Sequence, residues 1–149
     1  MMKQVVHKVA AYITCENRLL VFSHVDFPEA GIQIPCGTVD DGEDLDQAVL
    51  REAHEETGLK ELRIVSLLGT QTYDMRPIDG TERTVHRHYY HVSKPGRIEF
   101  DRWQHWENDP SEGASGPILF ELYWVEIPDG IPELGAELGD MLTHIIPDG

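Results

Sequence analysis

The sequence predicts a single domain, residues 1–149, of mixed α/β (α+β) structure: an α/β/α sandwich with a mixed β-sheet. One strongly helical stretch, 45–57, lies between segments rich in β-branched and aromatic residues. A second stretch, 131–146, predicts a closing helix. With 149 residues, 40% of them hydrophobic, the chain can bury one sizeable core without disulfides or metal ions.

The strands are predicted from apolar and aromatic runs separated by turn-forming residues. Residues 5–14 and 18–23 predict a β-hairpin, because Glu16 and Asn17 between them favour a tight turn. Four further strands are predicted at 62–73, 83–93, near 97–104 and at 118–127. The stretch 107–117 is a loop by composition.

The helix at 45–57 has clear signals at both ends. Asp44 suits the N-cap position, and Gln47 follows three residues later. No proline or glycine interrupts residues 45–57, and Gly58 stands where a left-handed residue commonly ends a helix. This is the most clearly defined element of the sequence.

The charge balance excludes several classes of function. There are 27 acidic and 12 basic residues, a net charge of -15, so most of the surface must repel nucleic acids and anionic membranes. No run approaches the roughly 18 apolar residues of a membrane span. Cys15 and Cys36 fit no metal-ligand spacing and no disulfide framework, which suits a reducing compartment. We expect a cytoplasmic protein without nucleic-acid or membrane partners, and leave a homodimer open.

Helix 45–57 gathers carboxylates on one side. Glu52, Glu55 and Glu56 fall within an arc of roughly 140° at about 100° per residue. Such a cluster is unfavourable when empty, and a divalent cation removes the repulsion. Carboxylate oxygens without Cys or His at ligand spacing favour Mg²⁺ or Mn²⁺, and magnesium usually completes its shell with waters and substrate phosphates. The pattern therefore predicts a metal site for a phosphorylated substrate.

Arg51 stands inside this acidic group. It precedes Glu52 and lies one or two helical turns beyond Glu43. Its guanidinium could pair with a carboxylate and hold it in orientation. The role predicted for Arg51 is therefore structural support of the site.

Together these residues resemble the signature box of the Nudix hydrolases. The family pattern is Gly, five residues, Glu, seven residues, Arg-Glu, an aliphatic residue, any residue, Glu-Glu, any residue, Gly and an aliphatic residue. Residues 37–59 match every fixed position, and only Ala53 is smaller than the usual aliphatic residue. The matching residues are Gly37, Glu43, Arg51, Glu52, Ala53, Glu55, Glu56, Gly58 and Leu59.

The resemblance implies a hydrolase that cleaves a nucleoside diphosphate linked to another group by means of metal-activated water. It implies that Glu52, Glu55, Glu56 and the carbonyl of Gly37 hold the metal. A carboxylate of the box, or Glu112 in the loop 107–117, would take the proton of the water. A solvated loop glutamate is the simpler interpretation of Glu112.

A basic and aromatic region follows the box. Six of the twelve basic residues lie between positions 76 and 102. We expect the non-phosphate part of the substrate here, and the candidates are Arg83, Arg87, Tyr89, Trp103 and Trp106. Cross-strand ion pairs with neighbouring acids and packing of the tryptophans in the core are the alternatives.

The stretch 85–92 also contains two closely spaced histidines. Strand alternation places His86 and His88 on one face and Arg87 and Tyr89 on the other. The histidine pair fits a transition-metal site or, more simply, ordinary hydrogen bonding in a half-polar strand.

Two other functions are compatible with the same fold. A Nudix domain that binds a nucleotide without cleaving it would ordinarily have lost box carboxylates, and none is missing here. An isomerase similar to isopentenyl diphosphate isomerase needs a cysteine and a glutamate facing each other in the site. Cys36 keeps that alternative open, although no basic residue beside it in the sequence favours a reactive thiol.

Overall fold

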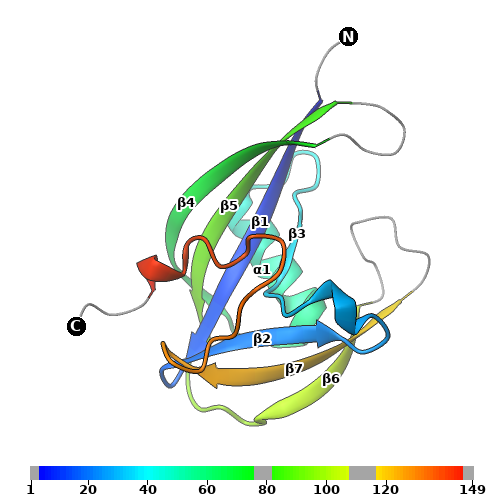
Figure 1. The fold of residues 1–149 in the computed structure, drawn as a ribbon. Helices are drawn as coiled ribbons and strands as arrows, with labels where there is room; N and C mark the ends of the chain where they lie inside the picture. Colours follow the sequence, from blue (N-terminus) through cyan, green and yellow to red (C-terminus); the bar gives the residue numbers. More distant parts are fainter. Residues whose placement is uncertain (1–3, 76–81, 108–116, 146–149) are drawn as a thin grey trace.

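The computed structural model describes residues 4–75, 82–107 and 117–145 (Figure 1). Its centre is a seven-stranded mixed sheet in the order β4-β5-β1-β2-β7-β6, with the short strand β3 paired to β1. The elements are β1 (Gln4–Cys15), β2 (Arg18–His24), the 3-10 turn η1 (Pro28–Ala30), β3 (Cys36–Thr38), α1 (Leu45–Thr57), β4 (Arg63–Met75), β5 (Arg83–Ser93), β6 (Arg102–Glu107), β7 (Ile118–Glu126) and the 3-10 turn η2 (Leu142–His144). No helix in the described part of the chain is long and apolar enough to cross a membrane.

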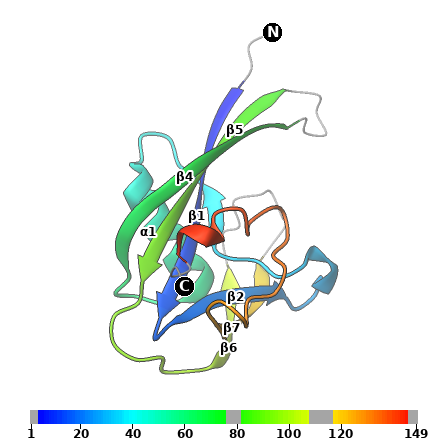
Figure 2. The ribbon, with the colours of Figure 1, turned by 60° about the vertical axis from the view of Figure 1, so that its left-hand side comes forward.

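Strands β1 and β2 form the predicted hairpin and then separate. Glu16 and Asn17 have φ angles of 50° and 61°, the left-handed pair that suits a two-residue hairpin turn. The strands pair beside this turn, after which β2 continues along β7 and β1 runs parallel to β5. The two directions are clearest in Figure 2. Their separation leaves room for β3, which pairs antiparallel with residues 8–10 in the middle of β1.

Helix α1 begins and ends where the sequence predicts. Asp44 occupies the N-cap position but its side chain makes no capping hydrogen bond. At the other end Gly58 is left-handed, with φ of 78°, and its N–H donates to the His54 carbonyl. Ala53 is completely buried against the sheet, so the small residue in the box lets the helix approach the strands closely.

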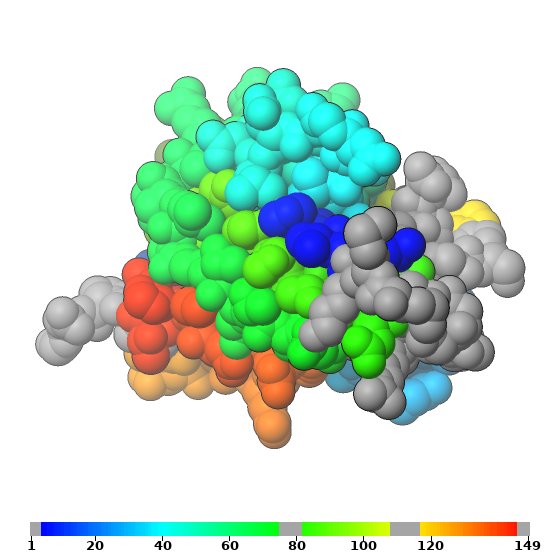
Figure 3. Space-filling view, turned by 90° about the horizontal axis from the view of Figure 1, so that it is seen from above, coloured from blue at the N-terminus to red at the C-terminus, as the bar shows by residue number. Residues whose placement is uncertain are grey.

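Each face of the sheet carries its own apolar core. One core lies under α1 and includes Val9, Val49 and Phe22. The other lies on the opposite face and includes Tyr12, Tyr89 and residues of the C-terminal segment. Seen from above (Figure 3), the loop before α1 and the C-terminal segment lie on opposite sides of β1, β4 and β5. The sheet is therefore the middle of three layers.

The predicted closing helix at 131–146 is wrong for its described part, 131–145. This segment, which we call the C-terminal strap, consists of turns and η2. Leu134 and Leu138 are four residues apart, the spacing of one helical turn. Both reach the core, but they do so from turns and not from a helix. Ala136 and Glu137 have φ angles of 52° and 61°, which no right-handed helix contains. The third layer of the sandwich is thus an irregular strap.

The predicted strand near 97–104 is displaced, because β6 covers 102–107. Gly96 has φ of 83° and Nζ of Lys94 donates to the Arg97 carbonyl at 2.6 Å, so the chain before β6 folds into a turn. Phe100, which falls within the predicted strand, is exposed in that connection. The strands predicted at 62–73, 83–93 and 118–127 are confirmed as β4, β5 and β7.

We expect Tyr12→Phe to weaken the attachment of the strap. The buried Tyr12 hydroxyl donates to the Leu138 carbonyl and accepts from the Met141 N–H, so its loss leaves two backbone groups without a partner. The free energy of unfolding should fall by about 1–3 kcal/mol in urea titrations.

Tyr123→Phe is the matched control, because its hydroxyl has no hydrogen-bond partner within the described ranges. Equal unfolding midpoints for the two variants would show that Tyr12 does not hold the strap.

Candidate metal centre

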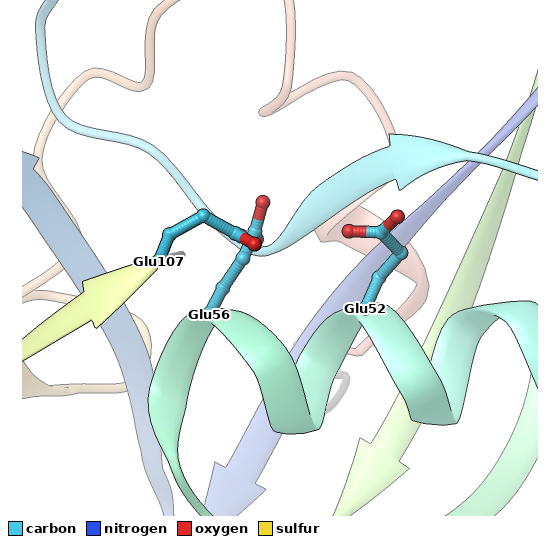
Figure 4. A group of neighbouring side chains, drawn as sticks. All are labelled: Glu52, Glu56 and Glu107. Atoms are coloured by element: carbon cyan, nitrogen blue, oxygen red, sulfur yellow. The ribbon is translucent and has the colours of Figure 1, made fainter. Parts of the chain in front are cut away.

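Three buried glutamates converge beside the second half of α1. Glu52 and Glu56, one helical turn apart on α1, point toward Glu107 at the end of β6 (Figure 4). One carboxylate oxygen from each lies within 4.8 Å of the others. Their exposed fractions are 3%, 7% and 3%, so water screens them poorly. We call these residues the glutamate cluster.

Sequence reasoning missed Glu107. The displaced strand prediction put this residue at the start of a loop, whereas it is the last residue of β6. Burial alternates along β6, so Trp103, His105 and Glu107 face α1. The sequence carried one signal for Glu107. It stands at every second position after Trp103 and His105, so in a strand all three side chains share one face.

The end of α1 holds β6 in place. The indole Nε1 of Trp103 donates to the Thr57 carbonyl at 2.9 Å, and Nε2 of His105 lies 2.8 Å from the Glu55 carbonyl. Carbonyls in the last helical turn lack partners within the helix, and these rings supply them. The same contacts set the position of Glu107 relative to the helix.

Burial raises the pKa values of the cluster. Burial raises the pKa of Glu52 to about 7, against the opposing effect of the Arg51 hydrogen bond. Burial raises the pKa of Glu56 well above its ordinary range, and the charges of Glu52 and Glu107 add to the effect. Without a cation, the cluster therefore holds protons near neutral pH.

Strand β3 closes the cluster from the other side. The Cys36 N–H donates to Oε2 of Glu56 at 2.9 Å. A Cβ atom at Gly37 would overlap the carboxylate of Glu52, so any side chain there would displace this carboxylate. The glycine at the first position of the box is therefore required for the close approach of β3 to α1.

Arg51 is paired as the sequence suggests. Its Nε and Nη2 donate to the two carboxylate oxygens of Glu43 at 2.8 and 2.9 Å. Nη1 donates to Glu52 at 3.0 Å and to Glu55 at 3.3 Å, and Nη2 also reaches the Thr38 carbonyl. These bonds keep the pKa of Glu43 below its usual range. One arginine thus links β3, the loop before α1, and the helix itself.

Glu55 does not join the cluster. Its side chain turns toward Arg51 and is 33% exposed, while Glu52 and Glu56 face Glu107. The three box glutamates, which the sequence predicts on one side of the helix, therefore differ in their surroundings. Glu52 and Glu56 are buried, whereas Glu55 is accessible.

The residues suggested for substrate binding do not converge. Arg83, Arg87 and Tyr89 lie on the face of β5 opposite α1, and Tyr89 is fully buried. Trp103 packs under the end of α1, whereas Trp106 is 52% exposed. Glu112 lies outside the described residues.

The two histidines form hydrogen bonds on the α1 side of the sheet. Nδ1 of His86 and of His88 each lie 2.9 Å from a threonine hydroxyl of β4. Both rings stack on His7, whose Nδ1 is 3.0 Å from Nε2 of His88. The simpler interpretation of this pair, hydrogen bonding, therefore agrees with the contacts. The Cys36 side chain packs against the core on the opposite face of the sheet, away from α1.

The donor set of the cluster fits Mg²⁺ or Mn²⁺. All three groups are carboxylates, and hard divalent cations prefer oxygen ligands. A cation among them would also replace the protons that burial retains on Glu52 and Glu56.

The amino-acid pattern of the NUDIX domain matches residues 6–138. The chain belongs to the Nudix hydrolase family. It is 41% identical over 66 residues to Nudix hydrolase 25 of Arabidopsis thaliana, a match that covers 44% of this chain and 37% of the plant protein. The similarity thus spans well under half of that relative's length.

Solved structures share the Nudix fold along the chain. The MutT protein from Methanosarcina mazei Go1 has a TM-score of 0.62 and 20% identity, covering 97% of this chain and 94% of that one. A MutT NUDIX hydrolase from Burkholderia pseudomallei has a TM-score of 0.56 and 24% identity, covering 96% and 99%. At these identities the likeness shows the fold.

Without metal, we expect Glu52→Gln to stabilise the protein at alkaline pH. The ordinary pKa of Glu52 is 4.5, and the folded value is about 7, so between these the folded state binds more protons than the unfolded one. Stability therefore falls as pH rises through that window. From about pH 5 to about pH 8, the variant should gain on the order of 2 kcal/mol over wild type in chemical unfolding with EDTA. A difference independent of pH would contradict the burial of an ionised Glu52.

We expect Glu107→Gln to weaken Mn²⁺ binding by at least about 10-fold in calorimetric titrations, because an amide oxygen lacks the charge of a carboxylate ligand. Glu121→Gln is the matched control, since Glu121 lies on β7 and faces Arg102 at 3.4 Å. Equal affinities of the two variants would place the metal away from Glu107.

Proposed function

We propose that the chain is a Mg²⁺- or Mn²⁺-dependent pyrophosphohydrolase. Its substrate would be a nucleoside diphosphate linked to another group, cleaved at a phosphoanhydride bond. The observation that carries this proposal is the glutamate cluster, where two box residues meet Glu107 in a buried site next to Gly37. The match of residues 37–59 to every fixed position of the Nudix box also supports the proposal.

Glu52, Glu56 and Glu107 would hold the metal, together with the carbonyl of Gly37. A bound Mg²⁺ supplies charge neutralisation for the phosphates and lowers the pKa of a coordinated water. The protein prepares this centre by burying the carboxylates and by fixing Glu56 through the Cys36 N–H.

Glu55 is our candidate for the residue that takes the proton from the attacking water. It is the box glutamate outside the cluster, and its partial exposure leaves it accessible to water. The contact with Nη1 of Arg51 would hold the carboxylate in place. Arg51 therefore acts as a positioning residue for both Glu52 and Glu55.

The aromatic candidates have unequal support. Trp106 is exposed enough to stack on a base or another flat group, and stays a candidate for substrate binding. Trp103 has its indole N–H committed to the Thr57 carbonyl and packs against the core, which favours a structural role. Glu112 stays a candidate from the sequence alone.

A substrate panel tests the proposal against a domain that only binds nucleotides. The purified chain with Mg²⁺ is incubated with nucleoside triphosphates, sugar nucleotides and dinucleoside polyphosphates, and the released phosphate and pyrophosphate are measured. Metal-dependent turnover supports a hydrolase. Nucleotide binding without any turnover across the panel would instead support a sensor.

We expect Glu55→Gln and Glu56→Gln to separate chemistry from metal binding. Both should lower kcat by at least about 100-fold, because each removes a charged group from the reaction centre. Only Glu56→Gln should also lose Mn²⁺ affinity, since Glu55 lies outside the cluster. Retained activity in both variants would refute the assignment, and lost Mn²⁺ affinity in Glu55→Gln would make Glu55 a ligand.

A further inference from the structure

A cleft lies between the C-terminal end of α1 and the connection from β5 to β6 (Figure 1). It has two compartments, of about 370 and 520 Å³, and cavities of this size are typical of small-molecule sites. Both compartments are lined by Gly58, Leu59, Lys94 and Glu99, so they are continuous. The described residues that line the cleft include no member of the glutamate cluster, so this is a second site.

The smaller compartment is aromatic. Phe100, Trp103 and Trp124 line it together with Leu59. The ring centroids of the two tryptophans are 6.4 Å apart and their planes are inclined by 44°, so the two indoles form a corner. The Phe100 side chain is 66% exposed, which leaves its ring free to contact a ligand. Walls of this kind fit a planar ring.

The aromatic compartment also offers an unused hydrogen-bond donor. Nε1 of Trp103 donates to the Thr57 carbonyl at 2.9 Å. The indole N–H of Trp124, in contrast, has no partner among the described residues and remains accessible. Because a half-buried indole N–H usually finds a partner, an oxygen atom of a ligand would complete this group.

The larger compartment is cationic. Lys60, Lys94 and Arg97 line it, and none of them forms an ion pair within the described ranges. Glu61 and Glu99 line it too, so three cations and two carboxylates leave one net positive charge. In a chain of net charge -15, this compartment is a local exception that attracts an anion.

All three cations keep N–H groups for a ligand. Nζ of Lys94 donates to the carbonyls of Arg97 at 2.6 Å and Pro95 at 3.4 Å, which leaves one of its three donors. The side chains of Lys60 and Arg97 are exposed and make no hydrogen bond with any described residue. An acidic group placed here would meet donors from two segments, 60–62 and 94–99.

We propose that the cleft binds an aromatic carboxylic acid, with its ring in the aromatic compartment and its carboxylate among the three cations. The ring and the charge of such a ligand are adjacent, as the two compartments are at Lys94. A carboxylate brings one negative charge, which matches the single net positive charge of the larger compartment. Ring contacts and charge-assisted hydrogen bonds would act together. This site is independent of the proposed hydrolase function.

Structural roles account for only part of the cleft. Trp103 anchors β6 to α1, and Gly58 ends the helix. Neither role requires the exposed ring of Phe100 or the unpaired charges of Lys60 and Arg97.

Calorimetry with three matched probes tests the chemistry of the ligand, in EDTA so that no metal takes part. The first probe is 2-naphthoate. The amide 2-naphthamide lacks its charge and should bind about 10-fold more weakly, whereas decahydro-2-naphthoate lacks its aromatic rings and should bind about 5-fold more weakly. Equal affinities for the acid and the amide would overturn the proposal. Tighter binding of 2-naphthyl phosphate than of 2-naphthoate would overturn the assignment of a carboxylate.

Two variants test the location of the site. Arg97→Gln and Phe100→Leu should each weaken 2-naphthoate binding about 5-fold, and both change exposed side chains, so the fold should be kept. Arg102→Gln is the matched control for the charge, because Arg102 faces Glu121 outside the cleft. Phe27→Leu is the control for the ring, since Phe27 is 60% exposed elsewhere. Neither control should change the affinity.

Nuclear magnetic resonance of the indole N–H groups provides a direct readout of the site. The signal of Trp124 should shift as 2-naphthoate is added, and that of Trp106, which does not line the cleft, should stay unchanged. Absence of saturable binding, a shift of Trp106 without one of Trp124, or equal affinities of the two test variants and their controls would overturn the site. None of these outcomes depends on turnover of a nucleotide.

Discussion

Three buried carboxylates cannot all be ionised at close range without a compensating positive charge, and the structure is organised around this constraint. Gly37 leaves space for Glu52, the Cys36 N–H holds Glu56, and two rings of β6 dock its last residue, Glu107, against the helix. Protons satisfy the cluster when no cation is present. A divalent metal offers the same compensation and also brings the chemistry.

Arg51 contributes a different kind of compensation. It is a permanent charge placed beside the cluster, not within it, and its bidentate pair with Glu43 fixes the loop before α1. Because Arg51 also contacts Glu52 and Glu55, the buried and the accessible glutamates are oriented by one side chain. The box therefore works as a connected unit in which the spacing of its charges follows from the helical turn.

The sequence predicted what depends on local chemistry. The ends of α1 were predicted from Asp44 and Gly58, and the hairpin was predicted from the turn-forming Glu16 and Asn17. The long-range arrangement was not accessible in the same way. Glu107 reaches the cluster because His105 and Trp103 dock on helix carbonyls, a contact that no residue pattern reports. The helix predicted for the strap was wrong because Leu134 and Leu138 are four residues apart, as on one face of a helix, although they reach the core from an irregular segment. The left-handed backbone at Ala136 and Glu137 could not be recognised from the residue types.

The early separation of β1 and β2 divides the sheet into two wings. Helix α1 contacts both wings, because it packs on β1 and β3 and its end contacts β6, the strand that ends in Glu107. The glutamate cluster thus joins Glu107, from the wing of β2, β7 and β6, to Glu52 and Glu56 of the helix. An ion bound there would add a further link between this wing and α1, besides the contacts of Trp103 and His105 with the helix carbonyls.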